Sequence, residues 1–308
     1  MKKILIIAIL LLGLASCSLI VVDIKPTRIT LSENLTYEEN YDLVAAALKA
    51  GKTELKLELP AEPSDEIFKA IRRALLETEE VADGSIKMTL WGAEVIGENA
   101  FGYHADLTNE WVNELSSVSL PDAIEIKNDA FYGCHELQTF SAPKAKTLGR
   151  TVLVGCRELT HIELPMAEII GRGSLHDLSS LIKINLPELK ILSGSMFALC
   201  ENLETVILPK VTRIEERVFE ENRSLKTIVF GSPIESIDGE LFYSHDESHP
   251  FRTERIDLTL SRRQRTMIND FYGEPSPYEG RWQAAGEAFN FNSNEFAGYR
   301  FKSISPYE

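Results

Sequence analysis

The chain has 308 residues, of which 32 are basic and 47 acidic, and its formal net charge is −15 at pH 7. Such an acidic surface repels phosphate backbones, so nucleic acid is excluded as a natural partner. A chain of this length exceeds what most simple hydrophobic cores hold, but a repeating architecture escapes that limit because it grows lengthwise.

The first residues are typical of an export signal. Lys2 and Lys3 precede an apolar run over residues 4–12, which is too short to span a bilayer as a mature helix. The segment 14–17, Leu-Ala-Ser-Cys, resembles the lipobox of bacterial lipoproteins, in which the cysteine is lipidated and becomes the new N-terminus. An ordinary cleaved signal with a nearby cysteine is the alternative.

We therefore expect residues 1–16 to be a lipoprotein signal peptide and Cys17 to be the lipid attachment site. Ser18 fits sorting to the outer membrane, and the sequence leaves open whether the protein faces the periplasm or the cell surface. Removal of the signal takes away two lysines and no acid, which leaves a mature charge of −17.

Helical and strand patterns alternate after this segment. Residues 17–35 are predicted to form a tether and a lead-in strand. Apolar residues recur at helical spacing over residues 36–50, and Gly51 ends the pattern. A strand alternation over 55–59 and a helix that begins at Ser64 follow. We expect residues 36–83 to form a helix–strand–helix cap over the first core face of a repeat array.

A period of 22 residues dominates the middle of the chain. Leucine recurs without a slip, and each copy opens the frame Leu-x-x-(Ile/Val)-x-Leu-Pro or a close variant. Proline ends the predicted strand in most copies because it cannot donate to a ladder. This period predicts a solenoid over residues 84–243, in which each unit contacts its neighbours. The leucines are Leu115, Leu137, Leu159, Leu181, Leu203 and Leu225.

The inward and outward positions of each predicted strand can be separated. The outward positions are mostly small, polar or β-branched, and they form the candidate binding face. We single out Thr139, His161, Glu163, Lys183, Asn185, Thr205 and Thr227. A merely soluble sheet face is the competing interpretation, because the face lacks the aromatic anchors of protein hot spots.

Three further cysteines, Cys134, Cys156 and Cys200, occupy one position of three repeats. Other repeats have Leu178 or Asn222 there, so we expect a small buried slot that holds free thiols. A Cys134–Cys156 disulfide is the alternative, since exported proteins commonly form such bonds.

The period fails after residue 243. Residues 244–308 contain a last strand and an aromatic-rich segment, which predict an ordered C-terminal cap. That segment and an insertion at 102–113 are alternatives to the sheet face as regions that contact a partner. His245 and His249 lie in a polar stretch before Pro250, so a solvated loop is favoured over a helical zinc site.

The frame is similar to one known repeat family. Ala130-Phe131-Tyr-Gly-Cys134-His-Glu-Leu137 and Met-Phe197-Ala-Leu-Cys200-Glu-Asn-Leu203 resemble the BspA-like leucine-rich repeats of bacterial surface proteins. The resemblance implies an α/β leucine-rich repeat solenoid with a parallel β-sheet on one face. It also implies a binding or adhesion role, although the repeat carries no fixed binding residues.

These observations predict a lipid-anchored envelope protein, and not an enzyme, that binds a protein or glycan partner. A structural or assembly role without an external ligand is the alternative. The sequence contains no nucleophile elbow or phosphate loop, and we expect no metal and no cofactor.

Overall fold

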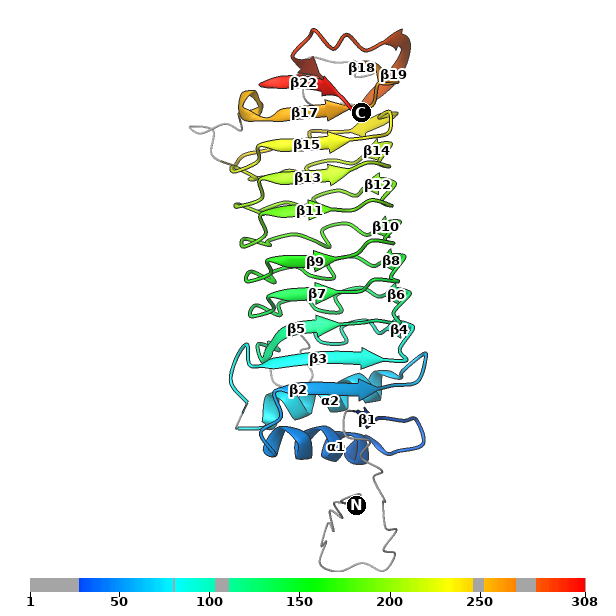
Figure 1. Cartoon of the computed structure of the whole chain (residues 1–308), viewed down its shortest axis with the longest axis vertical. Helices are drawn as coiled ribbons and strands as arrows, with labels where there is room; N and C mark the ends of the chain where they lie inside the picture. Colours follow the sequence, from blue (N-terminus) through cyan, green and yellow to red (C-terminus); the bar gives the residue numbers. More distant parts are fainter. Residues whose placement is uncertain (1–27, 80, 103–110, 246–251, 270–280, 308) are drawn as a thin grey trace, which may run out of the picture.

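The computed structural model describes residues 28–79, 81–102, 111–245, 252–269 and 281–307. The chain winds into an elongated solenoid, with two helices near its N-terminal end (Figure 1). The predicted signal peptide and Cys17 lie outside the described residues.

Parallel strands stack along the front of the solenoid into what we call the main sheet. Its first part has the order β1-β2-β3-β5-β7-β9 and its second part β11-β13-β15-β17-β22. Repeat positions pair in register, so that Thr139 lies opposite His161 and Thr205 opposite Thr227. The strands are β1 (Ile29–Thr30), β2 (Glu54–Glu58), β3 (Ile86–Trp91), β5 (Leu115–Ser119), β7 (Thr139–Ser141), β9 (His161–Glu163), β11 (Lys183–Asn185), β13 (Thr205–Leu208), β15 (Thr227–Phe230), β17 (Asp257–Leu260) and β22 (Ser303–Pro306).

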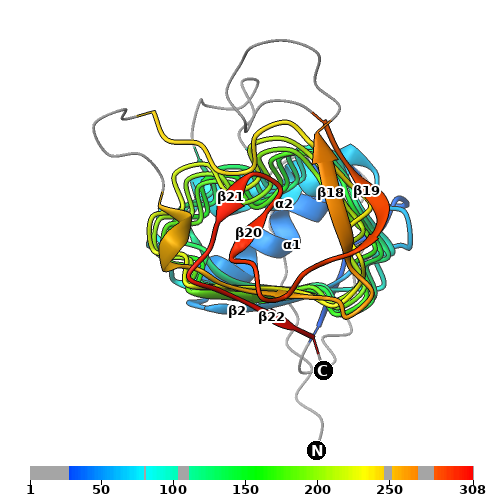
Figure 2. The ribbon, with the colours of Figure 1, turned by 90° about the horizontal axis from the view of Figure 1, so that it is seen from above.

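A second ladder, here called the side ladder, follows the turn that ends each main strand. Seen from above, β2 and β22 mark one side of the cross-section, and β18 and β19 stand on the adjoining side (Figure 2). The side ladder consists of β4 (Val95–Ile96), β6 (Glu125–Ile126), β8 (Thr147–Leu148) and β10 (Ile169–Ile170), and then of β12 (Ile191–Leu192), β14 (Arg213–Ile214), β16 (Ser236–Asp238), β18 (Arg265–Asn269) and β19 (Arg281–Ala288).

The solenoid encloses one continuous hydrophobic core. All six periodic leucines are buried, and Leu137 and Leu159 belong to the same cluster. The segment that follows each side-ladder strand forms a third side of the solenoid, which we call the loop side. Phenyl rings stack there from unit to unit: the Phe219 ring centroid lies 6.0 Å from that of Phe197 and 5.4 Å from that of Phe242. The predicted solenoid with a parallel sheet on one face is therefore confirmed.

Five of the described units turn their loop through two left-handed residues. One occurs just after the side-ladder strand, as at Asp129 and Thr151, and the second lies four residues later, as at Gly155 and Leu199. Glycine adopts this conformation without strain, whereas Leu199 has φ +60° and a β-carbon that opposes it. The repeat therefore imposes its backbone even where the side chain is unfavourable.

The cysteine column has a polar function that the sequence did not reveal. Cys134, Cys156 and Cys200 are free and fully buried, and the Cys134–Cys156 disulfide is not formed. Each thiol donates to a carbonyl of the preceding unit, as from Cys156 Sγ to Phe131 O at 3.3 Å. Asn222 replaces the thiol with its amide, which donates to Phe197 O at 2.8 Å. Four units therefore place a buried donor in this slot, whereas Leu178 fills it with an apolar side chain.

Two helices, α1 (Tyr37–Lys49) and α2 (Asp65–Glu77), occupy the segments where the sequence predicts them. Thr36 and Glu39 form a capping box at the start of α1. Ser64 precedes α2 as expected, but its side chain makes no capping hydrogen bond.

From α2, the buried Arg72 donates to Asn99 O at 2.5 Å and Ala100 O at 2.8 Å. This arginine supplies donors to loop carbonyls at the first unit, where no earlier repeat precedes it.

The C-terminal segment packs on the last unit. Phe242 contacts Tyr299 and Phe301, with ring centroids 5.0 and 6.1 Å apart, and both aromatic side chains are buried. A short helix, η1 (Thr253–Arg255), precedes β17, and β20 (Glu295–Phe296) pairs with β21 (Tyr299–Arg300). β22 then adds in parallel to β17. Aromatic side chains in this segment thus contribute to the core.

Candidate binding surface

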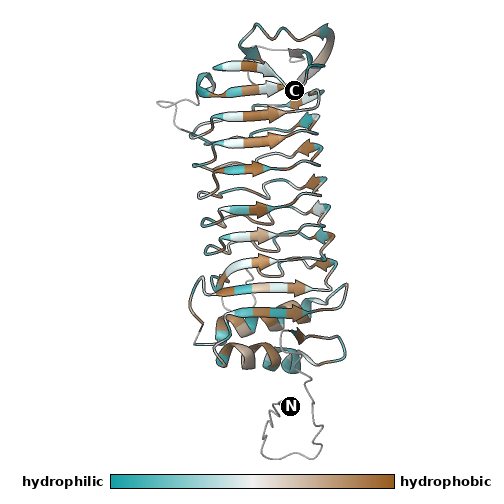
Figure 3. Cartoon of the chain, viewed as in Figure 1, coloured by the Kyte–Doolittle hydropathy of each residue, from teal (hydrophilic) through white to brown (hydrophobic). Residues whose placement is uncertain are grey.

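The outward side chains of the two parts of the main sheet form one side of the solenoid, which we call the outer sheet face. Alternate residues of each strand are buried in the core, and the others face away from it. The hydropathy along β2 and β3 alternates in the same way (Figure 3). No described helix or strand covers this face (Figure 2). The repeat therefore presents this surface with a regular chemistry.

The structure places all seven predicted binding residues on this face, in two groups. Thr139, His161 and Glu163 lie on β7 and β9 in the first part of the sheet. Lys183, Asn185, Thr205 and Thr227 lie on β11, β13 and β15 in the second part. His161, Glu163, Lys183 and Asn185 are exposed, whereas the three threonines are half-buried. Whether these residues bind a partner stays a prediction.

Hydroxyl groups along the face are already linked to their neighbours. Thr139 donates to the Ser117 hydroxyl at 2.7 Å, and Ser141 donates to Glu163 Oε2 at 2.6 Å. Hydroxyls can donate and accept at once, so each retains capacity for a further hydrogen bond. The face therefore presents rows of small groups held in fixed positions.

Towards the C-terminal edge, the face carries a fixed charge pair. Lys302 Nζ donates to Asp257 Oδ2 at 2.7 Å, and Ser303 donates to Oδ1 at 2.6 Å. The hydrogen bond from Lys302, followed by that from Ser303, lowers the pKa of Asp257. Asp257 therefore stays ionised, with much of its charge compensated locally.

The outer sheet face carries little of the protein's negative charge. Its outward acids on β2, β9 and β17 are nearly balanced by lysines on β2, β3 and β11. The acidic excess of the chain therefore lies mainly on other surfaces. Charged residues on the strands of this face are Glu54, Glu58, Glu163 and Asp257 against Lys56, Lys87 and Lys183, and Lys302 lies beside β22.

Sequence reasoning missed the ends of the face. Glu54 and Lys87 extend one row towards the N-terminus, and Asp257 and Ser303 extend it towards the C-terminus. The alternation in residues 55–59 and 86–90 was a usable signal for the first extension. No sequence period announces β22, because it reaches the sheet after an irregular segment.

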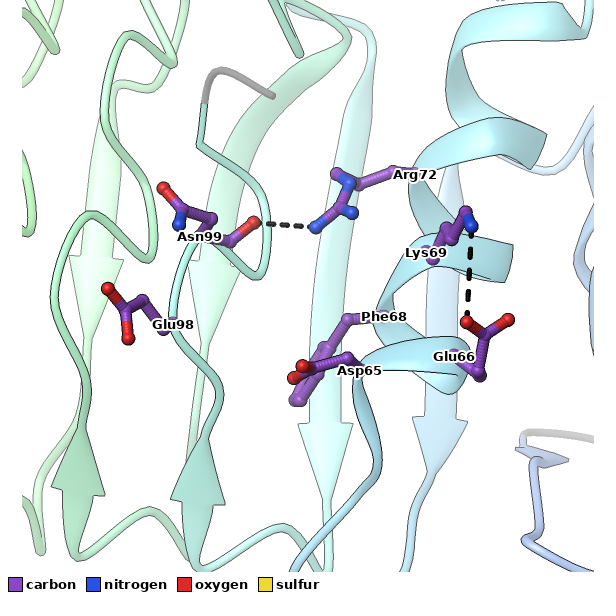
Figure 4. Close-up of a pocket in the computed structure, with 7 residues that line it drawn as sticks. All are labelled: Asp65, Glu66, Phe68, Lys69, Arg72, Glu98 and Asn99. Carbon is purple, nitrogen blue, oxygen red and sulfur yellow. Dashed lines mark hydrogen bonds and ion pairs between the residues drawn. The ribbon is translucent and has the colours of Figure 1, made fainter. Parts of the chain in front are cut away.

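A separate hollow of about 290 Å³ lies between α2 and the loop after β4 (Figure 4). Its polar lining is mixed in charge, with Lys69 within 3.9 Å of Glu66 and Arg72 bound to backbone carbonyls. Burial lowers the pKa of Arg72. This geometry fits a structural contact between helix and first unit. The lining residues are Asp65, Glu66, Phe68, Lys69, Arg72, Glu98 and Asn99.

Other candidate chemistry has little geometric basis in the described ranges. His245 Nε2 lies 2.7 Å from Glu220 Oε1, and its proposed companion His249 falls outside the described residues. Among the described side chains, no three His, Cys, Asp or Glu residues converge as metal ligands. None of the described helices combines the length and apolar character needed to cross a bilayer.

Comparison with known families decides the classification. A model of the BspA-type leucine-rich repeat region matches in six copies, over residues 94–222 and 124–249. The chain belongs to the BspA-type leucine-rich repeat family. These matches coincide with the BspA-type units that carry β4 to β16 and with the central part of the outer sheet face.

Solved structures of similar proteins come from several bacteria. A leucine-rich cell surface protein of Faecalibacterium prausnitzii is 22% identical, with a TM-score of 0.41 over 56% of this chain and 61% of that chain. A leucine-rich repeat protein of Eubacterium ventriosum is 19% identical, with a TM-score of 0.43 over 52% and 42%. The BspA-type chain thus spans less than two thirds of either. No curated protein matches it.

Proposed function

We propose that this BspA-type protein is an exported, lipid-anchored binding module whose outer sheet face contacts a protein or glycan partner. The observation that carries the proposal is the long uncovered row of ordered polar groups on the main sheet. Paired strands that fix such groups within each part of the sheet lower the entropy lost on binding. Binding, and not catalysis, is the function that this arrangement supports.

The chemistry of the face favours a partner that hydrogen-bonds. Serine and threonine hydroxyls alternate with a few charged residues, and the near balance of those charges does not demand a strongly basic partner. Glycans and polar protein surfaces both meet this description, because both offer many donors and acceptors. A structural role in the envelope without external ligand is the competing function, and it predicts no such contact.

The binding test uses the mature protein and arrays of glycans and extracellular matrix proteins. Glu163→Ala with Lys183→Ala removes two exposed groups from the outer sheet face without changing net charge. Glu125→Ala with Lys127→Ala is the matched control on the side-ladder surface, where both residues are also exposed. We expect the first variant to weaken any detected binding about tenfold or more and the control to leave it unchanged. Equal affinities for both variants would contradict the assignment to this face.

Lipid anchoring is tested separately at Cys17. We expect the wild-type chain expressed in a Gram-negative host to partition into the detergent phase of a Triton X-114 extract. Cys17→Ala should move it to the aqueous phase, because one acyl chain contributes about 0.8 kcal/mol per buried methylene. Protease treatment of intact cells then distinguishes surface display from a periplasmic location. Aqueous partitioning of the wild type would refute the anchor.

A further inference from the structure

The main sheet is interrupted between the third and fourth repeat units. On one side, Thr160 N donates to Gln138 O at 3.0 Å and Ala142 N to Glu163 O at 3.0 Å. On the other, Glu204 N donates to Ile182 O at 2.8 Å and Leu186 N to Ile207 O at 3.1 Å. Between β9 and β11, both of which the structure describes completely, no such bond is formed. Figure 1 shows the wider space between these two arrows.

The side ladder is interrupted at the same junction. β10 ends the first four-stranded group, and β12 begins the next group. One long backbone bond remains there, from Lys190 N to Glu168 O at 3.4 Å. Side chains supply further links, from the Ser193 hydroxyl to Ile170 O at 2.7 Å and from Arg172 Nη2 to Glu216 Oε1 at 3.0 Å. The Lys190 and Glu168 side chains also form an ion pair, in which both partners are substantially exposed.

The loop side of the same junction stays closed. Gly173 N donates to Gly194 O at 3.1 Å, and Asp177 N donates to Ala198 O at 2.9 Å. The buried Cys200 thiol donates to Leu175 O at 3.1 Å. The third and fourth units therefore remain joined along the loop edge, while β9 and β11 are unpaired and β10 and β12 keep few links.

Side-chain packing changes at this point as well. Phenyl rings stack before the junction, at Phe101 and Phe131, and after it, at Phe197 and Phe219. Leucines at 153 and 175 replace them in between. Ile162 is partly exposed, whereas its equivalents on β7 and β11, Phe140 and Ile184, are buried. Several large apolar side chains are also exposed in these two units, namely Met166, Ile169, Ile182 and Ile191.

We propose that the junction between the third and fourth units is a hinge. The two halves, which are the described residues up to 180 and those from 181 onward, tilt about the closed loop edge, and this opens and closes the main sheet between β9 and β11. In a solenoid, each interface contributes separately to stability, so motion concentrates at the weakest interface. His161, Glu163, Lys183 and Asn185 flank the hinge on the outer sheet face, and the tilt changes the spacing between these pairs. The hinge does not depend on the proposed function.

Amide hydrogen exchange on the full mature chain tests whether the ladder is open. Leu164 occupies the position of Ala142 and Leu186, whose amides are bonded across their junctions. We expect the Leu164 amide to exchange on the order of tenfold faster or more than these two equivalents. Equal protection at the three positions would overturn the proposal.

Spin labels test whether the open junction moves. Cysteines at Thr139 and Thr227 are four rungs apart across the hinge, and cysteines at Glu54 and His161 are four rungs apart within the first half. Four intact rungs span about 19 Å. Double electron–electron resonance should show a longer and broader distance distribution for the first pair than for the second. Fast exchange at Leu164 with equally narrow distributions for both pairs would show a fixed gap and overturn the hinge.

Discussion

Asn222 offers a sharp test of the buried donor column. Its side-chain nitrogen donates to Phe197 O at 2.8 Å, but its Oδ1 accepts no hydrogen bond from the described residues and is buried. At the equivalent position of the preceding unit, Cys200 donates through its thiol and carries no surplus acceptor. Asn222→Cys therefore keeps a donor and removes the unsatisfied oxygen.

Removing the unsatisfied oxygen raises the free energy of unfolding, whereas replacing the amide donor with a thiol lowers it by a smaller amount. An unsatisfied buried polar atom costs about 1–3 kcal/mol, and exchanging an amide donor for the weaker thiol loses about 0.5–1 kcal/mol. We expect Asn222→Cys to raise the free energy of unfolding by about 1 kcal/mol, measured by urea denaturation with circular dichroism. The reciprocal Cys200→Asn should lower it by a similar amount or more. Destabilisation by both swaps would refute this reasoning, because it would show that each site is fitted to its own residue.

Further predictions concern the backbone, the aromatic stack, the N-terminal end and the thiols. Leu199→Gly should preserve or raise the stability, because it removes left-handed backbone strain of about 1–2 kcal/mol. Gly155→Ala, at the equivalent position of another unit, should lower the stability by about 1–2 kcal/mol, although the new β-carbon would have no neighbour closer than 3.6 Å. Thermal unfolding of both variants measures these changes. Phe219→Ala should cost about 3–5 kcal/mol in urea unfolding, because the ring fills the space between Phe197 and Phe242, and a loss under 1 kcal/mol would contradict the packing. Arg72→Met should cost about 1–3 kcal/mol by leaving Asn99 O and Ala100 O without their donor, with the exposed Arg157→Met as control. Burial raises the pKa of the Cys134 and Cys156 thiols and raises that of Cys200 to about 12. Above pH 9 the thiols therefore lose protons in the unfolded chain before they do so in the folded one, and the free energy of unfolding should fall as the pH rises. An unchanged urea midpoint between pH 8 and pH 10.5 would contradict this.

The sequence predicts the repeated part of this fold well, because each inward position recurs every 22 residues and has the same burial requirement. Leu159 and Leu181 are buried where the period places them, and His161 and Lys183 face outward. The period could not reveal the interruption between β9 and β11, since the leucines on both sides keep their spacing. Contacts that cross units outside the frame, such as Arg72 with Asn99 or Ser303 with Asp257, were equally invisible.

The candidate site shows the same division. Alternation on the strands identifies which side chains face outward, and the family identifies the class of protein. Neither the alternation nor the family identifies a ligand, because any soluble repeat places polar residues such as Thr139 and Ser141 at the outward positions of its strands. Only the structure adds that the Thr139 hydroxyl donates to Ser117 and the Ser141 hydroxyl to Glu163 on the neighbouring strands.

Inserting one extra unit tests the stacked architecture most directly. Duplicating residues 203–224 after Ser224 adds one complete 22-residue unit in frame, whereas duplicating residues 203–213 at the same place adds half a unit. We predict that the full unit is accepted, with a cooperative thermal transition close to wild type and a particle lengthened by about 5 Å in small-angle scattering. The half unit should shift Leu225 and the inward residues that follow it out of register and unfold the C-terminal part. Equal tolerance of both insertions, or equal disruption by both, would contradict the stacked solenoid.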